Sequence, residues 1–111
     1  MENGNIRVAF RMRVSPGQEA EYIDRHNPIW SELETALKQH GVVTYSIYLD
    51  RATNDLFAYA EVSDLEQWQA IASTSVCQKW WVSMAPLMPT NADNSPVVGE
   101  LEEIFHIEAE A

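Results

Sequence analysis

The chain has 111 residues, of which 17 are acidic and 7 are basic, so its formal net charge is −10 at neutral pH. This length fits one compact domain, and we expect a single domain over residues 1–111 with flexible ends at 1–5 and 108–111. An acidic surface repels nucleic-acid phosphates and anionic membrane surfaces. The composition therefore argues against both partners and favours a small neutral or cationic ligand.

The single cysteine, Cys77, permits no intramolecular disulfide, which is typical of a reducing compartment. The first five residues are polar and do not resemble a secretory signal. No apolar run reaches the roughly 20 residues that a membrane span requires. We therefore expect a cytoplasmic protein without membrane segments.

The first half of the chain alternates between strand and helix patterns. Residues 6–14 alternate apolar and polar side chains, which predicts a strand. Residues 15–18, Ser-Pro-Gly-Gln, match a capping box with Ser15 as N-cap, and apolar residues then recur at helical spacing. Pro28 predicts a kink, or a restart with Asn27 as a new N-cap. Gly41 suits the end of the helix.

Two further alternating segments, residues 43–49 and 56–62, predict strands that pair as an antiparallel hairpin. Ser63 and Asp64 then open a second helical region. The polar run 73–75 offers new caps, and we expect it to begin another helical turn that ends at the prolines that follow.

The last part of the chain predicts a polar loop at residues 90–96 and a fourth strand at residues 101–107. The resulting order is β-α-β-β-α-β, which is the ferredoxin-like α+β arrangement of one antiparallel sheet with helices on one face. The other face of such a sheet needs a cover, and we expect a second copy of the chain to supply it.

The residue types argue against several kinds of functional site. The four glycines are scattered, so there is no glycine-rich phosphate loop. The lone cysteine and three distant histidines argue against a metal site, and we expect none. Cys77 lies in an apolar helical pattern and is more simply a buried small residue than a nucleophile, although a Cys–His pair stays open.

Tyr22 and His26 are four residues apart, so they share one face of the expected helix. A phenol and an imidazole on one face can both reach a small polar ligand, and histidine exchanges protons near neutral pH. The alternative is a capping or solvated histidine beside a core tyrosine.

Trp80 and Trp81 are adjacent, so their side chains point about 100° apart on a helix. One indole can be buried while the other lines a cavity, where its apolar face suits a sugar ring. The alternative is packing in the core and at a subunit interface. Tyr45 and Tyr48 lie on opposite faces of their strand, so one of them can reach a pocket while the other packs against a helix or a partner. The alternative for either tyrosine is ordinary strand packing.

Four segments of the chain, in this order, resemble the L-rhamnose mutarotase family. The resemblance extends from about residue 6 to about residue 107. The matching segments are RHNPIW at 25–30, YSIYLD at 45–50, ASTSVCQKWW at 72–81 and NADNSP at 91–96.

This resemblance implies a homodimeric α+β barrel and a cofactor-free enzyme that interconverts the α and β anomers of L-rhamnose, a small neutral monosaccharide. It also implies His26 as the catalytic proton donor. The sugar-contacting residues it implies are Tyr22, Tyr45, Trp80 and Trp81.

The second proton-transfer group is open at this point, with Tyr22, Asp24, Glu61 or water as candidates. Two other functions are also open. One is a cofactorless monooxygenase, since other dimeric α+β barrels do such chemistry, and the other is a sugar-binding protein without turnover.

Overall fold

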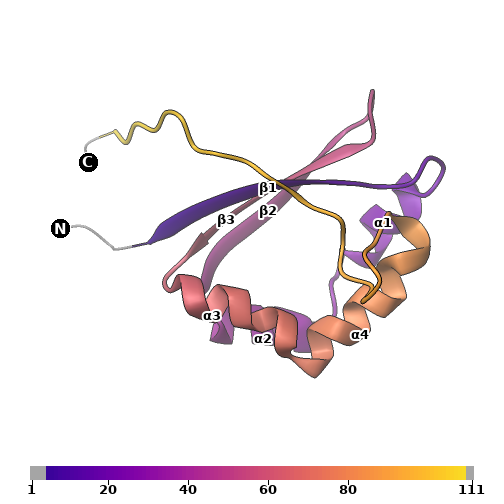
Figure 1. The fold of residues 1–111 in the computed structure, drawn as a ribbon, viewed down its shortest axis with the longest axis horizontal. Helices are drawn as coiled ribbons and strands as arrows, with labels where there is room; N and C mark the ends of the chain where they lie inside the picture. Colours follow the sequence, from indigo (N-terminus) through magenta and orange to yellow (C-terminus); the bar gives the residue numbers. More distant parts are fainter. Residues whose placement is uncertain (1–4, 110–111) are drawn as a thin grey trace.

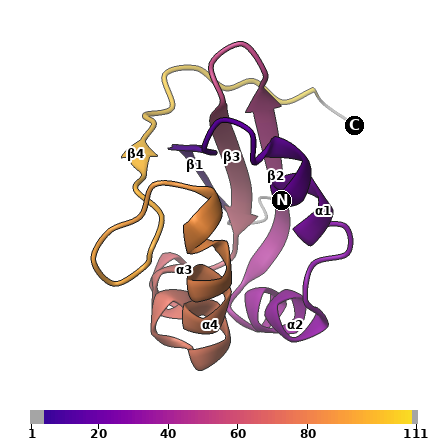
Figure 2. The ribbon, with the colours of Figure 1, turned by 90° about the vertical axis from the view of Figure 1, so that its right-hand side faces the viewer.

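The computed structural model describes residues 5–109 and has the expected order of elements over that range. The strands form one antiparallel sheet in the order β2-β3-β1-β4, and the helices cover one of its faces (Figures 1 and 2), so the ferredoxin-like α+β prediction is confirmed. The elements are β1 (Ile6–Arg13), α1 (Glu19–Arg25), α2 (Ser31–Gln39), β2 (Val42–Asp50), β3 (Asp55–Val62), α3 (Leu65–Ala70), the 3-10 turn η1 (Ile71–Ser73), α4 (Ser75–Met84), the 3-10 turn η2 (Ala85–Leu87) and β4 (Gly99–Glu100).

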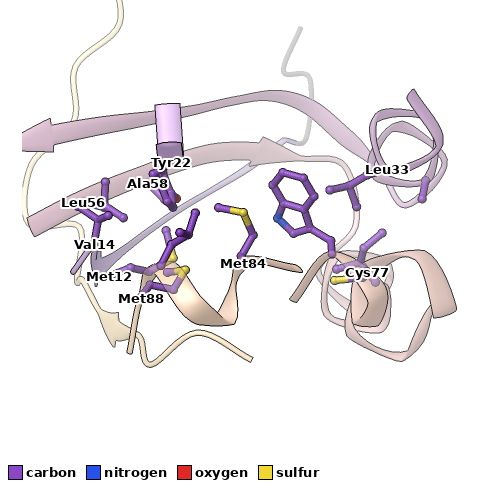
Figure 3. Packing of buried hydrophobic residues seen from close by; sticks show 13 residues of the cluster. Met12, Val14, Tyr22, Leu33, Leu56, Ala58, Cys77, Met84 and Met88 are labelled. Atoms are coloured by element: carbon purple, nitrogen blue, oxygen red, sulfur yellow. The ribbon is translucent and has the colours of Figure 1, made fainter. Parts of the chain in front are cut away.

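The core lies between the sheet and the helices. In the β1–β3 register Met12 is opposite Leu56 and Phe10 is opposite Ala58, so these alternate residues share the face that the helices cover. Figure 3 shows buried side chains from both layers, including Val14 from the end of β1 and Met84 from α4, pointing toward one another. The alternate apolar residues of the strands therefore form the sheet side of this core.

The first helix begins later than the capping box predicts. The backbone amide of Gln18 donates to the carbonyl of Ser15 at 3.0 Å in a turn, and α1 starts at Glu19 without a side-chain cap. Gly17 lies at φ +86°, in the left-handed region that a right-handed helix cannot use. The prediction of Ser15 as N-cap is therefore wrong, because the glycine forms a turn before the helix starts.

The proline does divide the helical region into α1 and α2, as one of the two alternatives predicted. However, α2 begins after Trp30, and Asn27 is not its N-cap. The Asn27 side chain instead donates to the carbonyl of Ile23 at 2.8 Å, so it completes the end of α1. In the second helical region the predicted starts are confirmed: Asp64 and Thr74 accept from backbone amides of α3 and α4.

The predicted fourth strand at residues 101–107 is wrong. The fourth strand is the two-residue β4, which pairs with Phe10 and Arg11 of β1. After Leu101 the chain leaves the sheet, and Ile104 is 89% exposed. Glu103 accepts two hydrogen bonds from the Arg7 guanidinium at 3.0 Å, which draws this segment across the uncovered face instead of along the strand edge (Figure 1).

Two further expectations concern the ends of the chain and membrane segments. The flexible ends predicted at residues 1–5 and 108–111 lie mostly outside residues 5–109. Within that range, none of the helices has the length and apolar character needed to cross a membrane.

A matched pair of valine substitutions tests the location of the core. Val14 is fully buried, whereas Val82 on α4 is 59% exposed. Val14→Ala should lower the free energy of unfolding by about 2–3 kcal/mol, because it removes buried methyl groups and leaves a cavity. Val82→Ala should change it by less than about 0.5 kcal/mol. Chemical denaturation measures both, and equal effects would contradict this assignment of the core.

Candidate active site

A pocket of about 1330 Å³ opens between the helices and the covered face of the sheet. Its walls include residues of α1, α2, β2, α4 and the loop that follows η2. The structure brings together in this one pocket all five of the site residues expected from the sequence, namely Tyr22, His26, Tyr45, Trp80 and Trp81.

His26 lies at the C-terminal end of α1, where the last carbonyls of a helix have no partner within it. Its Nδ1 is 2.8 Å from the carbonyl oxygen of Tyr22. A carbonyl oxygen only accepts, so Nδ1 must carry the proton and donate it. The other ring nitrogen, Nε2, is thereby left as the nitrogen that can take up and release a proton.

Burial lowers the pKa of His26 below its usual value of 6.5, and the hydrogen bond to Tyr22 opposes this shift only in part. Desolvation disfavours the imidazolium because a charge loses more hydration than a neutral ring does. The imidazole is therefore neutral at pH 7, with a basic lone pair on Nε2.

Aromatic rings fix the orientation of the imidazole. The Tyr22 ring lies 4.5 Å from it between centroids, and the Trp80 ring lies 5.2 Å away at an interplanar angle of 89°. Trp30 in turn packs edge-on against Trp80 at 5.1 Å. Edge-to-face contacts of this kind are favourable and directional, so the ring is held from two sides by α1 and α4.

His40 provides an internal comparison. It caps α2 as His26 caps α1, with its Nδ1 2.8 Å from the carbonyl oxygen of Ala36. His40 does not line the pocket. A capping histidine is thus a correct description of both residues, and it is the surrounding pocket that distinguishes His26.

The two pocket tyrosines are hydrogen-bonding groups rather than bases. Burial raises the pKa of Tyr22 to about 12, and it raises the pKa of Tyr45 further, so both stay protonated. Within residues 5–109 no side-chain polar atom is both sealed from solvent and unpaired. Tyr48 lies on the uncovered face opposite Phe57, so Tyr45 is the strand tyrosine that reaches the pocket.

The adjacent tryptophans differ in burial, but both line the pocket. Trp80 is buried in the core and in contact with His26, whereas Trp81 is half-buried. Trp68 was not among the predicted site residues, yet it lines the same pocket and packs edge-on against Tyr45 at 5.6 Å. Its spacing on α3 indicated only an apolar face, and no local signal showed that this face reaches the pocket.

Two candidates for the second proton-transfer group lie away from the pocket. Asp24 is exposed on α1 and does not line it. Glu61 is on the uncovered face of the sheet, where it accepts from the Tyr59 hydroxyl at 2.8 Å. Cys77 does line the pocket, but burial raises the pKa of its thiol to about 11, so it is a poor nucleophile.

These features define a class of protein: a small ferredoxin-like α+β domain with a neutral histidine in an aromatic pocket. Comparison with known proteins then gives the family. The family model for L-rhamnose mutarotase matches residues 7–107. An L-rhamnose mutarotase from Shigella flexneri serotype 5b is 57% identical over 102 residues, which cover 92% of this chain and 98% of the relative. The chain therefore belongs to the L-rhamnose mutarotase family.

Solved structures agree with this assignment. The crystal structure of an L-rhamnose mutarotase from Formosa agariphila superposes with a TM-score of 0.85 at 44% identity, covering 93% of this chain and 99% of that one. A protein from Chloroflexus aurantiacus assigned as an antibiotic biosynthesis monooxygenase gives a TM-score of 0.58 at 16% identity, covering 92% and 95%. The second likeness shows a shared fold alone, so it does not favour the monooxygenase alternative.

Proposed function

We propose that His26 is the acid–base group with which this mutarotase interconverts the α and β anomers of L-rhamnose. The observation that carries the proposal is the hydrogen bond from Nδ1 to the Tyr22 carbonyl, inside an aromatic and partly desolvated enclosure. That bond commits one ring nitrogen to the backbone. It leaves Nε2 as the atom that exchanges a proton with the sugar.

Anomer exchange requires the ring to open, the C1–C2 bond to rotate and the ring to close on the other face of the carbonyl. In opening, neutral His26 accepts the proton of the anomeric hydroxyl while the bond from C1 to the ring oxygen breaks. The ring oxygen takes its proton from the Tyr22 hydroxyl or from water. In closure these transfers reverse, so that His26 is the proton donor to the anomeric oxygen.

The other four residues are assigned to holding the sugar. The hydroxyls of Tyr22 and Tyr45 stay protonated, so each can donate to a sugar oxygen and accept from another hydroxyl. The indoles of Trp80 and Trp81 offer apolar faces to the C–H groups and to the methyl group of a 6-deoxy sugar. A preference for a methyl over a hydroxymethyl group should be modest, about 1–3 kcal/mol.

Replacing His26 while keeping a matched histidine control tests the catalytic role. His26→Ala should lower the enzymatic rate of anomer exchange by about 10²–10⁴-fold, because a positioned acid–base group supplies that much. His40→Ala removes the same kind of helix-capping bond from α2 and should leave the rate within about twofold. Saturation-difference NMR on equilibrated L-rhamnose measures both variants.

Thermal unfolding of each variant shows whether the fold is retained. Full activity in a folded His26→Ala protein would refute the proposal. Equal losses in the two histidine variants would also refute it, since helix capping alone would then explain the effect.

We infer that the protein works as a homodimer in the cytoplasm, without a nucleic-acid partner. The charge of −10 and the single, buried cysteine support the last two points. The homodimer is supported by the uncovered face of the sheet, which carries the aromatic side chains of Phe57 and the 64% exposed Tyr48. The segment beyond β4 adds the exposed apolar side chains of Leu101, Ile104, Phe105 and Ile107.

Placing a charge on this face should separate the subunits. Tyr48→Glu should convert a dimer into a monomer in sedimentation experiments at micromolar concentration, because a buried and unpaired carboxylate is costly at an interface. Val82→Glu, on the exposed side of α4, should leave the dimer intact. A wild-type protein that sediments as a monomer would contradict the inference.

A further inference from the structure

The C-terminal ends of α1 and α4 meet at Arg25. Its Nε donates to the carboxylate of Glu21 at 2.7 Å, one turn earlier on α1. Its Nη1 donates across to the backbone carbonyl of Ser83, near the end of α4. One guanidinium thus bonds to both helices at once, with its two contacts on different nitrogens.

Both helix ends need such a partner. The last four carbonyls of a helix lack internal donor partners, and they carry the negative end of the helix dipole. Two negative ends that approach one another repel, and a cation between them is stabilising. The planar guanidinium suits this position because its donors point in fixed, separate directions, whereas a lysine ammonium is a flexible point charge.

The Arg25 contact between the two helix ends lies directly beside His26, the proposed catalytic group. Arg25 precedes His26 in the chain, and Ser83 lies one turn after Trp80, to whose carbonyl its hydroxyl donates at 2.9 Å. Trp80 is the ring that packs edge-on against His26 across the two helices. The same two helix turns therefore carry both the Arg25 contact and the imidazole–indole contact.

We infer that Arg25 is a positioning residue, which holds the His26 ring against Trp80 by joining the ends of α1 and α4. The inference rests on the proposed role of His26. It assigns a task to a side chain that does not line the pocket. Arg25 acts on the reaction only through the orientation of its neighbour.

The test compares Arg25→Ala and Arg25→Lys with the control Arg51→Ala. Arg51 is an exposed arginine in the turn between β2 and β3 and does not line the pocket, so its replacement also removes a surface guanidinium. Arg25→Ala should lower kcat for L-rhamnose anomer exchange by about 10–100-fold while KM changes less than threefold, because small displacements of a catalytic group are costly. Arg25→Lys should fall between Arg25→Ala and wild type, and Arg51→Ala should stay within twofold of wild type.

A spectroscopic readout separates positioning from simple destabilisation. The edge-on contact produces ring-current shifts between the His26 and Trp80 protons, and these should move toward unperturbed values in Arg25→Ala, with a smaller change in Arg25→Lys. Arg25→Lys retains the positive charge, so the inference can still be tested with this variant if Arg25→Ala does not fold.

Three outcomes would overturn the inference: kcat within twofold of wild type in the folded Arg25 variants, unchanged ring-current shifts, or a loss confined to KM. Its failure is distinct from failure of the proposed function. An inactive His26→Ala beside a fully active Arg25→Ala would retain the role of His26 and reject that of Arg25.

Discussion

The hydrogen bond from His26 Nδ1 to the carbonyl of Tyr22 is the constraint on which the site depends. It satisfies a carbonyl at the end of α1, and it also determines which nitrogen of the imidazole carries a proton. The same bond holds the ring over Tyr22 and next to Trp80. One hydrogen bond therefore both completes the end of α1 and orients the imidazole that we propose as the base.

Burial keeps His26 neutral at pH 7, where it can act as a base, but it also lowers the stability of the folded protein in acid. Burial lowers the folded-state pKa below 6.5, so the unfolded chain binds a proton at a higher pH than the folded chain does. The contribution of His26 to stability is therefore complete above about pH 6.5, and it is lost as the pH falls through the lowered folded-state pKa. In the folded protein the neutral, reactive form persists below pH 6.5.

Local patterns predicted the parts of this structure that local physics decides. The difference in burial between Trp80 and the half-buried Trp81 follows from helical geometry alone. The capping box at Ser15 failed because the neighbouring Gly17 adopts a left-handed turn, which competes with helix formation. The strand predicted after β4 failed because apolar alternation does not show which edge a segment pairs with, and the ion pair between Arg7 and Glu103 draws it elsewhere.

Local sequence patterns also predicted the site only in part. The four-residue spacing placed Tyr22 and His26 on one face, but only the fold shows that Tyr45 from β2 and Trp68 from α3 meet them in one pocket. Glu61 lies on the opposite side of the sheet, as the period-two alternation of residues 56–62 requires once the buried face is known. Residues that converge from distant elements need the tertiary structure, because their separation in the sequence carries no information about distance.

The most direct test of the account is to follow the anomer-exchange rate of the wild-type enzyme with pH and, in parallel, the titration of His26 by NMR. If neutral His26 is the base, kcat/KM falls in acid with a midpoint that matches the NMR midpoint of His26, and both lie below pH 6.5. A rate that stays constant while His26 becomes protonated would contradict the central claim.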